Sequence, residues 1–164
     1  MMIIYNGSIG STSYTNQTES LYGKEELEMA NVILASHGEL SKGMLDTVKM
    51  IIGDMAEGVE TYSLLPGANA DDFAAELKQR IDADEEEYII ICDVLGGSVC
   101  NSLVQLTVNE RVKVLAGMNL PLVIEIAVAN QTGDIDLDTI IQTGKDGVSQ
   151  TSILAASDEE DSDF

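Results

Sequence analysis

The sequence has no tryptophan, only two cysteines and a single histidine, and its 8 lysines and arginines stand against 29 aspartates and glutamates. The resulting formal net charge of −21 excludes the basic surfaces that bind nucleic acid or anionic lipid. No apolar run is long enough to cross a bilayer, and no basic region or long apolar region of a signal peptide stands at the start. We therefore expect a cytoplasmic protein that does not bind nucleic acid.

The two cysteines, Cys92 and Cys100, match neither a zinc-binding pattern nor a redox CxxC motif. We interpret them as reduced and mostly buried thiols. The sequence therefore predicts neither a metal site nor a cofactor.

Composition divides the chain into three parts. Residues 1–28 form a leader rich in small polar residues, which we expect to be disordered. The codons of Lys24-Glu25-Glu26 can spell a purine-rich ribosome-binding sequence ahead of Met29, so we hypothesise that the leader is translated upstream sequence. Residues 29–154 have the length and apolar content of one domain with a core, and residues 155–164 form an acidic tail.

Strand and helix patterns alternate within the predicted domain. Continuous apolar runs at 32–36 and 88–92 predict buried parallel strands. Further strands are predicted at 59–64, 112–116 and 148–154. Apolar residues at helical spacing predict helices at 39–52, after the cap Asn69, after Ser98, at 122–129 and at 135–143. This alternation predicts an α/β fold, with a mostly parallel sheet flanked by helices on both faces.

Two loops that follow predicted strands carry chemically useful side chains. His37 follows the first strand, and Asp93 follows the third. In open α/β sheets, sites form beyond the carboxyl ends of the strands. A strand order of 2-1-3-4 makes the first and third strands neighbours, so we expect His37 and Asp93 to face each other.

The pairing of an imidazole with a carboxylate suits nucleophilic chemistry. Imidazole is nucleophilic and partly neutral at physiological pH. A carboxylate that binds one ring nitrogen fixes the tautomer and leaves the other nitrogen free to attack. Taken alone, His37 also suits a surface or capping residue, and Asp93 also suits a turn cap.

The residues around this pair predict a phosphate-binding turn. Gly96, Gly97 and Ser98 precede a helix, where backbone N–H groups and a hydroxyl can bind phosphate oxygens. We assign Ser36 and Gly38, on either side of His37, to the same set, since glycine permits close approach. Together these residues predict a phosphoryl group that passes through His37.

Five groups of residues stand in a recognisable order, at 36–38, 66–70, 93–98 with Asn101, 116–121 and 143–148. Over residues 29–154 the chain thereby resembles the IIA domain of the mannose-family sugar phosphotransferase system. The resemblance implies a doubly wound α/β sandwich. It also implies a homodimer in which a terminal strand, 148–154 here, exchanges onto the partner's sheet as an antiparallel edge.

The resemblance further implies what the site residues do. His37 matches the histidine that accepts phosphate on Nε2 from the phosphocarrier protein HPr and passes it to a histidine of a IIB component, ahead of membrane IIC and IID components. Asp93 matches the carboxylate that orients the ring through Nδ1, and Ser98 matches the serine of the loop. Leu95 stands where members often carry an aromatic residue, and we expect it to contact a partner. Because an acidic tail follows, the IIB component is expected on a separate polypeptide.

Two alternative interpretations stay open. The phosphotransferase subunit of a phosphoenolpyruvate-dependent dihydroxyacetone kinase shares this fold and a histidine at the same place, although the paired glycines favour the sugar system. A non-catalytic regulatory module, binding different partners with and without phosphate, is the other. The sugar is not specified, because selectivity in these systems lies in the membrane components.

Overall fold

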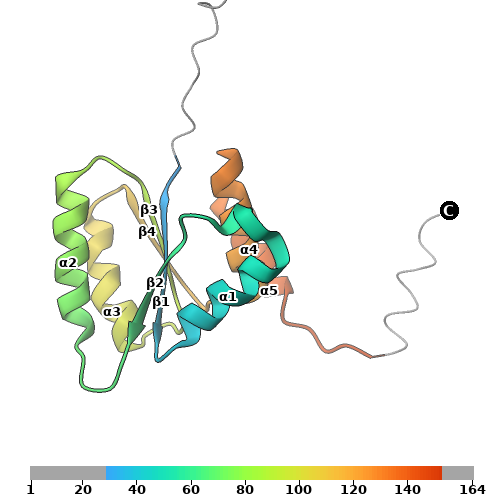
Figure 1. Ribbon diagram of the computed structural model, residues 1–164, viewed down its shortest axis with the longest axis horizontal. Helices are drawn as coiled ribbons and strands as arrows, with labels where there is room; N and C mark the ends of the chain where they lie inside the picture. Colours follow the sequence, from blue (N-terminus) through green and yellow to red (C-terminus); the bar gives the residue numbers. More distant parts are fainter. Residues whose placement is uncertain (1–28, 153–164) are drawn as a thin grey trace, which may run out of the picture.

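The computed structural model describes residues 29–152. The predictions made for residues 1–28 and for the acidic tail lie outside the described residues. In the described part of the chain, four parallel strands form one sheet in the order β2-β1-β3-β4, as predicted (Figure 1). The strands are β1 (Asn31–His37), β2 (Glu60–Leu64), β3 (Tyr88–Cys92) and β4 (Val112–Ala116).

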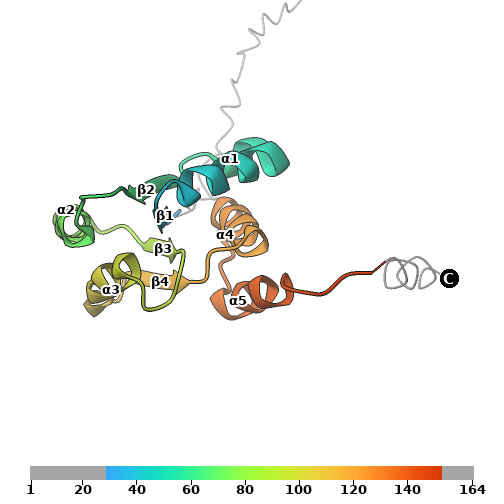
Figure 2. The same ribbon diagram turned by 90° about the horizontal axis from the view of Figure 1, so that it is seen from below.

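Helices cover both faces of this sheet (Figure 2). On one face lie α2 (Ala70–Ala83) and α3 (Ser98–Leu103). On the other face lie α1 (Leu40–Ile52), α4 (Leu120–Thr132) and α5 (Leu137–Asp146). The doubly wound α/β architecture is therefore confirmed.

The central strands divide the core into two apolar clusters. Alternate side chains of β3 enter opposite clusters: Ile90 packs with Leu77 of α2, and Ile89 packs with Ile126 of α4. All five residues of β3 are buried, which explains why its sequence is apolar throughout rather than alternating. Each fully buried aliphatic side chain of this kind contributes about 1.5–3 kcal/mol.

Local capping sets helix boundaries that apolar spacing alone misses. The Asn119 side chain accepts a hydrogen bond from the Leu122 N–H, so α4 begins two residues before the predicted 122. Asp136 caps α5 in the same way, and this helix therefore starts at Leu137 rather than at 135. After Ser98, the α-helix ends at Leu103 and continues as a 3₁₀ segment, η2 (Val104–Val108). A second 3₁₀ segment, η1 (Gly53–Ala56), follows α1.

Residues 148–152, which follow α5, adopt neither helix nor strand, and Figure 2 shows this segment leading away from the sheet. Residues 153 and 154 lie outside the described residues. Because the predicted edge strand would pair with a second copy of the chain, it stays a prediction.

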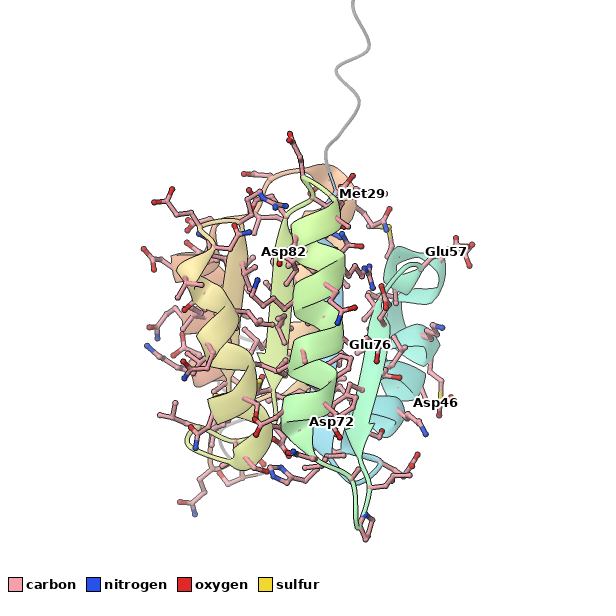
Figure 3. The ribbon with its side chains drawn as sticks, turned by 90° about the vertical axis from the view of Figure 1, so that its left-hand side faces the viewer. Met29, Asp46, Glu57, Asp72, Glu76 and Asp82 are labelled. Carbon is pink, nitrogen blue, oxygen red and sulfur yellow. The ribbon has the colours of Figure 1, made fainter. Side chains whose placement is uncertain are left out.

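The outer surface is acidic. Figure 3 looks onto α2, where Asp72, Glu76 and Asp82 lie on the exposed side of the helix. Two further exposed carboxylates, Asp46 of α1 and Glu57 after η1, lie at the right-hand side of the same view. A surface of this kind repels polyanions. Within the described residues, no helix combines the length and the apolar character needed to span a membrane.

Candidate active site

The candidate site lies at the carboxyl edge of the sheet, where β1 and β3 end side by side. Ala35 of β1 pairs with Cys92 of β3, so the residues that follow, His37 and Asp93, emerge next to each other. Gly38 then turns the chain into α1 with a positive φ of 55°, and its N–H donates to the Leu64 carbonyl of β2. The predicted proximity of His37 and Asp93 is confirmed.

Asp93 binds both the ring and the backbone of His37. Its Oδ2 atom lies 2.8 Å from the ring Nδ1 and accepts a second hydrogen bond, also of 2.8 Å, from the His37 backbone N–H. Since an ionised carboxylate only accepts, the ring nitrogen Nδ1 carries the proton. In the neutral imidazole, the lone pair is then on Nε2.

The environment of Asp93 keeps it ionised. Burial acts to raise the pKa of this carboxyl, but hydrogen bonds from the His37 backbone, the His37 ring and the Val94 N–H outweigh it and lower the pKa below its usual value. The Asp93 side chain is only 11% exposed, whereas the His37 side chain is 42% exposed. A charged carboxylate therefore lies beneath an imidazole that a partner can reach.

The turn at 96–98 closes against the other side of the ring. The Ser98 hydroxyl oxygen lies 3.0 Å from Nε2, to which it can donate. A Cβ atom at Gly97 would stand 2.9 Å from Cε1 of His37, so only glycine fits there. Gly96 has a φ of 78°, a conformation that glycine adopts without strain. Close approach to the imidazole thus explains Gly97, and the backbone conformation of the turn explains Gly96.

Two other predicted site residues have different surroundings. The Ser36 side chain is buried, and its oxygen accepts a hydrogen bond of 2.8 Å from the Ser41 N–H at the start of α1. This placement favours a role in holding the His37 turn over contact with phosphate. Leu95, by contrast, is 82% exposed at the tip of the loop.

Two residues support the site from positions to which the sequence analysis assigned no role. Ser41 is buried and donates through its hydroxyl to the Tyr62 carbonyl, which ties α1 to β2. Asn101 donates from its side-chain amide to the Gly96 carbonyl at 2.9 Å. The signal for Ser41 is a serine in the first turn of a helix, which is common. Asn101 belongs to the recognised group at 93–98 with Asn101, but that pattern does not say what its side chain contacts.

The cysteines lie behind the loop and take no visible part in the site. Both are free and buried, as expected from the sequence. Burial, followed by the neighbouring Cys100, raises the pKa of the Cys92 thiol to about 12 and keeps it protonated. Among the residues that the structure describes, no group of three or more His, Cys, Asp or Glu residues is placed to hold a metal ion.

Known proteins resemble this chain in sequence. The family model described as "EIIA-man: PTS system fructose IIA component" matches residues 31–141. The sorbose-specific EIIA component of Klebsiella pneumoniae is 35% identical over 100 residues, which span 60% of this chain and 73% of that protein. The mannose-specific EIIAB component of Escherichia coli K12 is 26% identical over 124 residues, spanning 71% of this chain but only 38% of that longer protein.

Solved structures share the fold. The mannose/sorbose-specific IIA subunit from Enterococcus faecalis matches with a TM-score of 0.64 at 24% identity, covering 76% of this chain and 96% of that one. A phosphotransferase EIIA component from Streptococcus agalactiae also matches with a TM-score of 0.64, at 26% identity, covering 74% of this chain and 97% of that one. With a family model matched across the sheet and its helices, the chain belongs to the mannose-family EIIA components of the sugar phosphotransferase system.

Proposed function

We propose that this chain carries a phosphoryl group on Nε2 of His37, accepting it from HPr and passing it to a histidine of a IIB component for sugar uptake and phosphorylation. The observation that carries this proposal is the His37–Asp93 pair. A largely buried carboxylate fixes Nδ1 at 2.8 Å, while the ring itself is 42% exposed. These are the conditions for an oriented nucleophile that a protein partner can reach.

In the proposed step, the lone pair of Nε2 attacks the phosphorus atom held by HPr. The bond between phosphorus and the carrier breaks, and its electron pair leaves with the carrier. The phosphorylated ring becomes positively charged, and the Asp93 carboxylate stabilises that charge through Nδ1–H. Transfer to the IIB component repeats the displacement with this chain as donor. Positioning and electrostatics supply most of the catalysis in such transfers.

Ser98 has to move during this step. Its hydroxyl oxygen lies 3.0 Å from Nε2, in the space that the incoming phosphorus atom takes. We propose that the hydroxyl rotates and donates to a phosphoryl oxygen once transfer has occurred. Ser98 therefore covers the lone pair before transfer and binds the phosphoryl group after it.

Two of the three glycines near His37 have backbone N–H groups that are already bonded. The N–H of Gly38 is bonded to the Leu64 carbonyl, and the N–H of Gly97 is bonded to the Val94 carbonyl. Lacking side chains, Gly38, Gly96 and Gly97 leave the backbone open where phosphoryl oxygens and a partner have to approach. We propose this role for all three.

The loop also offers a contact surface for HPr and IIB. Leu95 is 82% exposed and the adjacent Val94 is 51% exposed, which places two apolar side chains beside the nucleophile. Exposed apolar residues next to a reacting group are typical of protein docking sites. The acidic surface of the chain speeds its encounter with basic partners. We propose that this exchange occurs in the cytoplasm, with membrane IIC and IID components reached through IIB.

We also propose a homodimer built on the free edge of β4. This strand pairs only with β3 within the described residues. A cavity of about 560 Å³ lies between β4 and α5, and its lining includes Val114, Ile141 and Val148. Residues 148–154 of a second copy, with apolar side chains at Val148, Ile153 and Leu154, would pair antiparallel with β4 along this space.

Phosphorylation with purified components tests the proposed function. The full chain is incubated with Enzyme I, HPr and phosphoenolpyruvate and analysed by intact mass, beside His37→Ala as the control. We expect an acid-labile gain of one phosphate in the wild type and none in the variant. A His37→Ala protein that still gains phosphate would contradict the assigned site. No gain in the wild type, with HPr active on another acceptor, would contradict the sugar-system role and favour a dihydroxyacetone kinase carrier.

A further inference from the structure

Asn101 holds the loop that closes on the imidazole. Its side-chain amide donates to the Gly96 carbonyl at 2.9 Å, and its backbone N–H donates to the Gly97 carbonyl, also at 2.9 Å. The backbone bond belongs to the first turn of α3 and does not depend on the side chain at position 101, proline excepted. The side-chain bond depends on an amide at this position, so the Gly96 carbonyl is fixed by the chemistry of Asn101.

The loop that Asn101 fixes has little freedom against the ring. Gly97 packs so closely that a Cβ atom there would stand 2.9 Å from Cε1 of His37 and 2.8 Å from Cγ1 of Val94. On the next residue, the Ser98 hydroxyl reaches Nε2 at 3.0 Å. A small rotation of the Gly96–Gly97 peptide therefore changes both the space beside the ring and the hydrogen bond to the attacking nitrogen.

We propose that Asn101 is a positioning residue for phosphoryl transfer, acting through the Gly96 carbonyl on Gly97 and Ser98. It touches neither His37 nor Asp93 by any hydrogen bond in the structure. This inference rests on the proposed role of His37 and assigns to Asn101 the setting of the distance between the loop and Nε2.

Two variants separate this role from simple helix stability. Asn101→Ala removes the donor, and Asn101→Asp keeps the shape but turns a carboxylate toward the Gly96 carbonyl, which repels it. Because the Asn101 side chain is exposed, neither change opens a cavity in the core. Gln105→Ala is the matched control, since Gln105 is an exposed amide on η2, farther along the same segment.

Transfer kinetics and ring spectroscopy together test the inference. We expect Asn101→Ala to accept phosphate from HPr about tenfold more slowly, since a misplacement of about 1 Å can cost ~100-fold. Asn101→Asp should be slower still, and Gln105→Ala should match the wild type. His37 is the only histidine, so its ring ¹⁵N signals are unambiguous. The Nε2 signal should shift in both Asn101 variants and stay in place in Gln105→Ala.

The two measurements distinguish failure of the inference from failure of the proposed function. If the wild type accepts phosphate but both Asn101 variants keep its rate and its Nε2 signal, the positioning role is refuted and the carrier role stands. If Gln105→Ala slows transfer as much as Asn101→Ala, the effect belongs to the whole segment, which also refutes the inference. If the wild type accepts no phosphate, the proposed function fails, and the Nε2 signals alone decide whether Asn101 positions the loop.

Discussion

Replacing Asp93 by asparagine tests the site most directly, because the shape is kept while the charge and one acceptor are lost. In the wild type, three N–H groups donate to this carboxylate. The backbone and ring of His37 donate to Oδ2, and the Val94 N–H donates to Oδ1 at 2.9 Å. An asparagine side chain has a single oxygen and an amide that only donates. Either orientation of that amide therefore leaves two donors facing each other.

The two orientations of the amide predict different losses of transfer rate. With the oxygen toward His37, the amide opposes the Val94 N–H and the ring keeps its tautomer. With the amide toward His37, it opposes the backbone N–H and donates to Nδ1, so the proton moves to Nε2 and blocks attack. The first case replaces a charge-assisted hydrogen bond of about 1.5–3 kcal/mol by a neutral one of about 0.5–1.5 kcal/mol. At about 1.36 kcal/mol per decade, the difference of about 1–1.5 kcal/mol slows transfer roughly 5- to 13-fold. The second case slows transfer further.

The assay is rapid-quench transfer from phosphorylated HPr, measured with Asp93→Asn beside Asp136→Asn. Asp136 is a helix cap whose carboxylate accepts the Asp138 and Thr139 N–H groups, and asparagine caps helices as well as aspartate does. We expect the control to keep the wild-type rate and both variants to fold. An unchanged rate in Asp93→Asn would refute the argument that the carboxylate orients and stabilises the ring.

The remaining predictions concern packing, pH and assembly. Gly97→Ala should slow transfer at least tenfold and cost ~1–3 kcal/mol of unfolding free energy, because its Cβ would meet His37 and Val94. Gly43→Ala is the control, since a Cβ there meets nothing within 4 Å, and it should not slow transfer. Urea-induced unfolding and transfer kinetics check both variants. Because folding lowers the pKa of Asp93, its stabilising contribution is complete above about pH 4 and is lost as pH falls through the lower folded value. The difference in unfolding free energy between wild type and Asp93→Asn should therefore shrink as the pH falls below about 4; a difference that grows in this range would contradict the argument. Truncation before Val148 should weaken the proposed dimer in sedimentation equilibrium, and a dimer of wild-type affinity would argue against strand exchange.

The sheet and the central pair of the site could be predicted because they depend on local pattern and on topology. An uninterrupted apolar run such as 88–92 is typical of a strand buried on both faces, and β3 occupies the middle of the sheet with all its residues buried. Once the order 2-1-3-4 is assumed, adjacency of β1 and β3 places His37 against Asp93 without further information. The structure confirms both steps.

Features set by individual side-chain hydrogen bonds could not be predicted in the same way. Ser36 stands next to His37 in sequence, yet its side chain turns inward because α1 presents the Ser41 N–H to it. The start of α4 depends on Asn119 accepting from Leu122, and apolar spacing carries no information about that bond. Asn101 reaches Gly96 only because the glycine turn folds back over the first turn of α3. Each contact requires the tertiary arrangement that it then stabilises.

The charges around His37 bear on how tightly a phosphoryl group would be held. Within the described part of the chain, no lysine or arginine forms a hydrogen bond with His37, Asp93 or Ser98. Charge-assisted bonds from a guanidinium or ammonium are roughly twice as strong as neutral ones, so a phosphoryl group on Nε2 would be held by weaker donors such as the Ser98 hydroxyl. The positive charge nearest to the phosphoryl group would be that of the imidazole ring, and the Asp93 carboxylate compensates this charge from the Nδ1 side. An arrangement of this kind stabilises the charged ring while leaving the phosphoryl oxygens loosely bound, which favours onward transfer over retention.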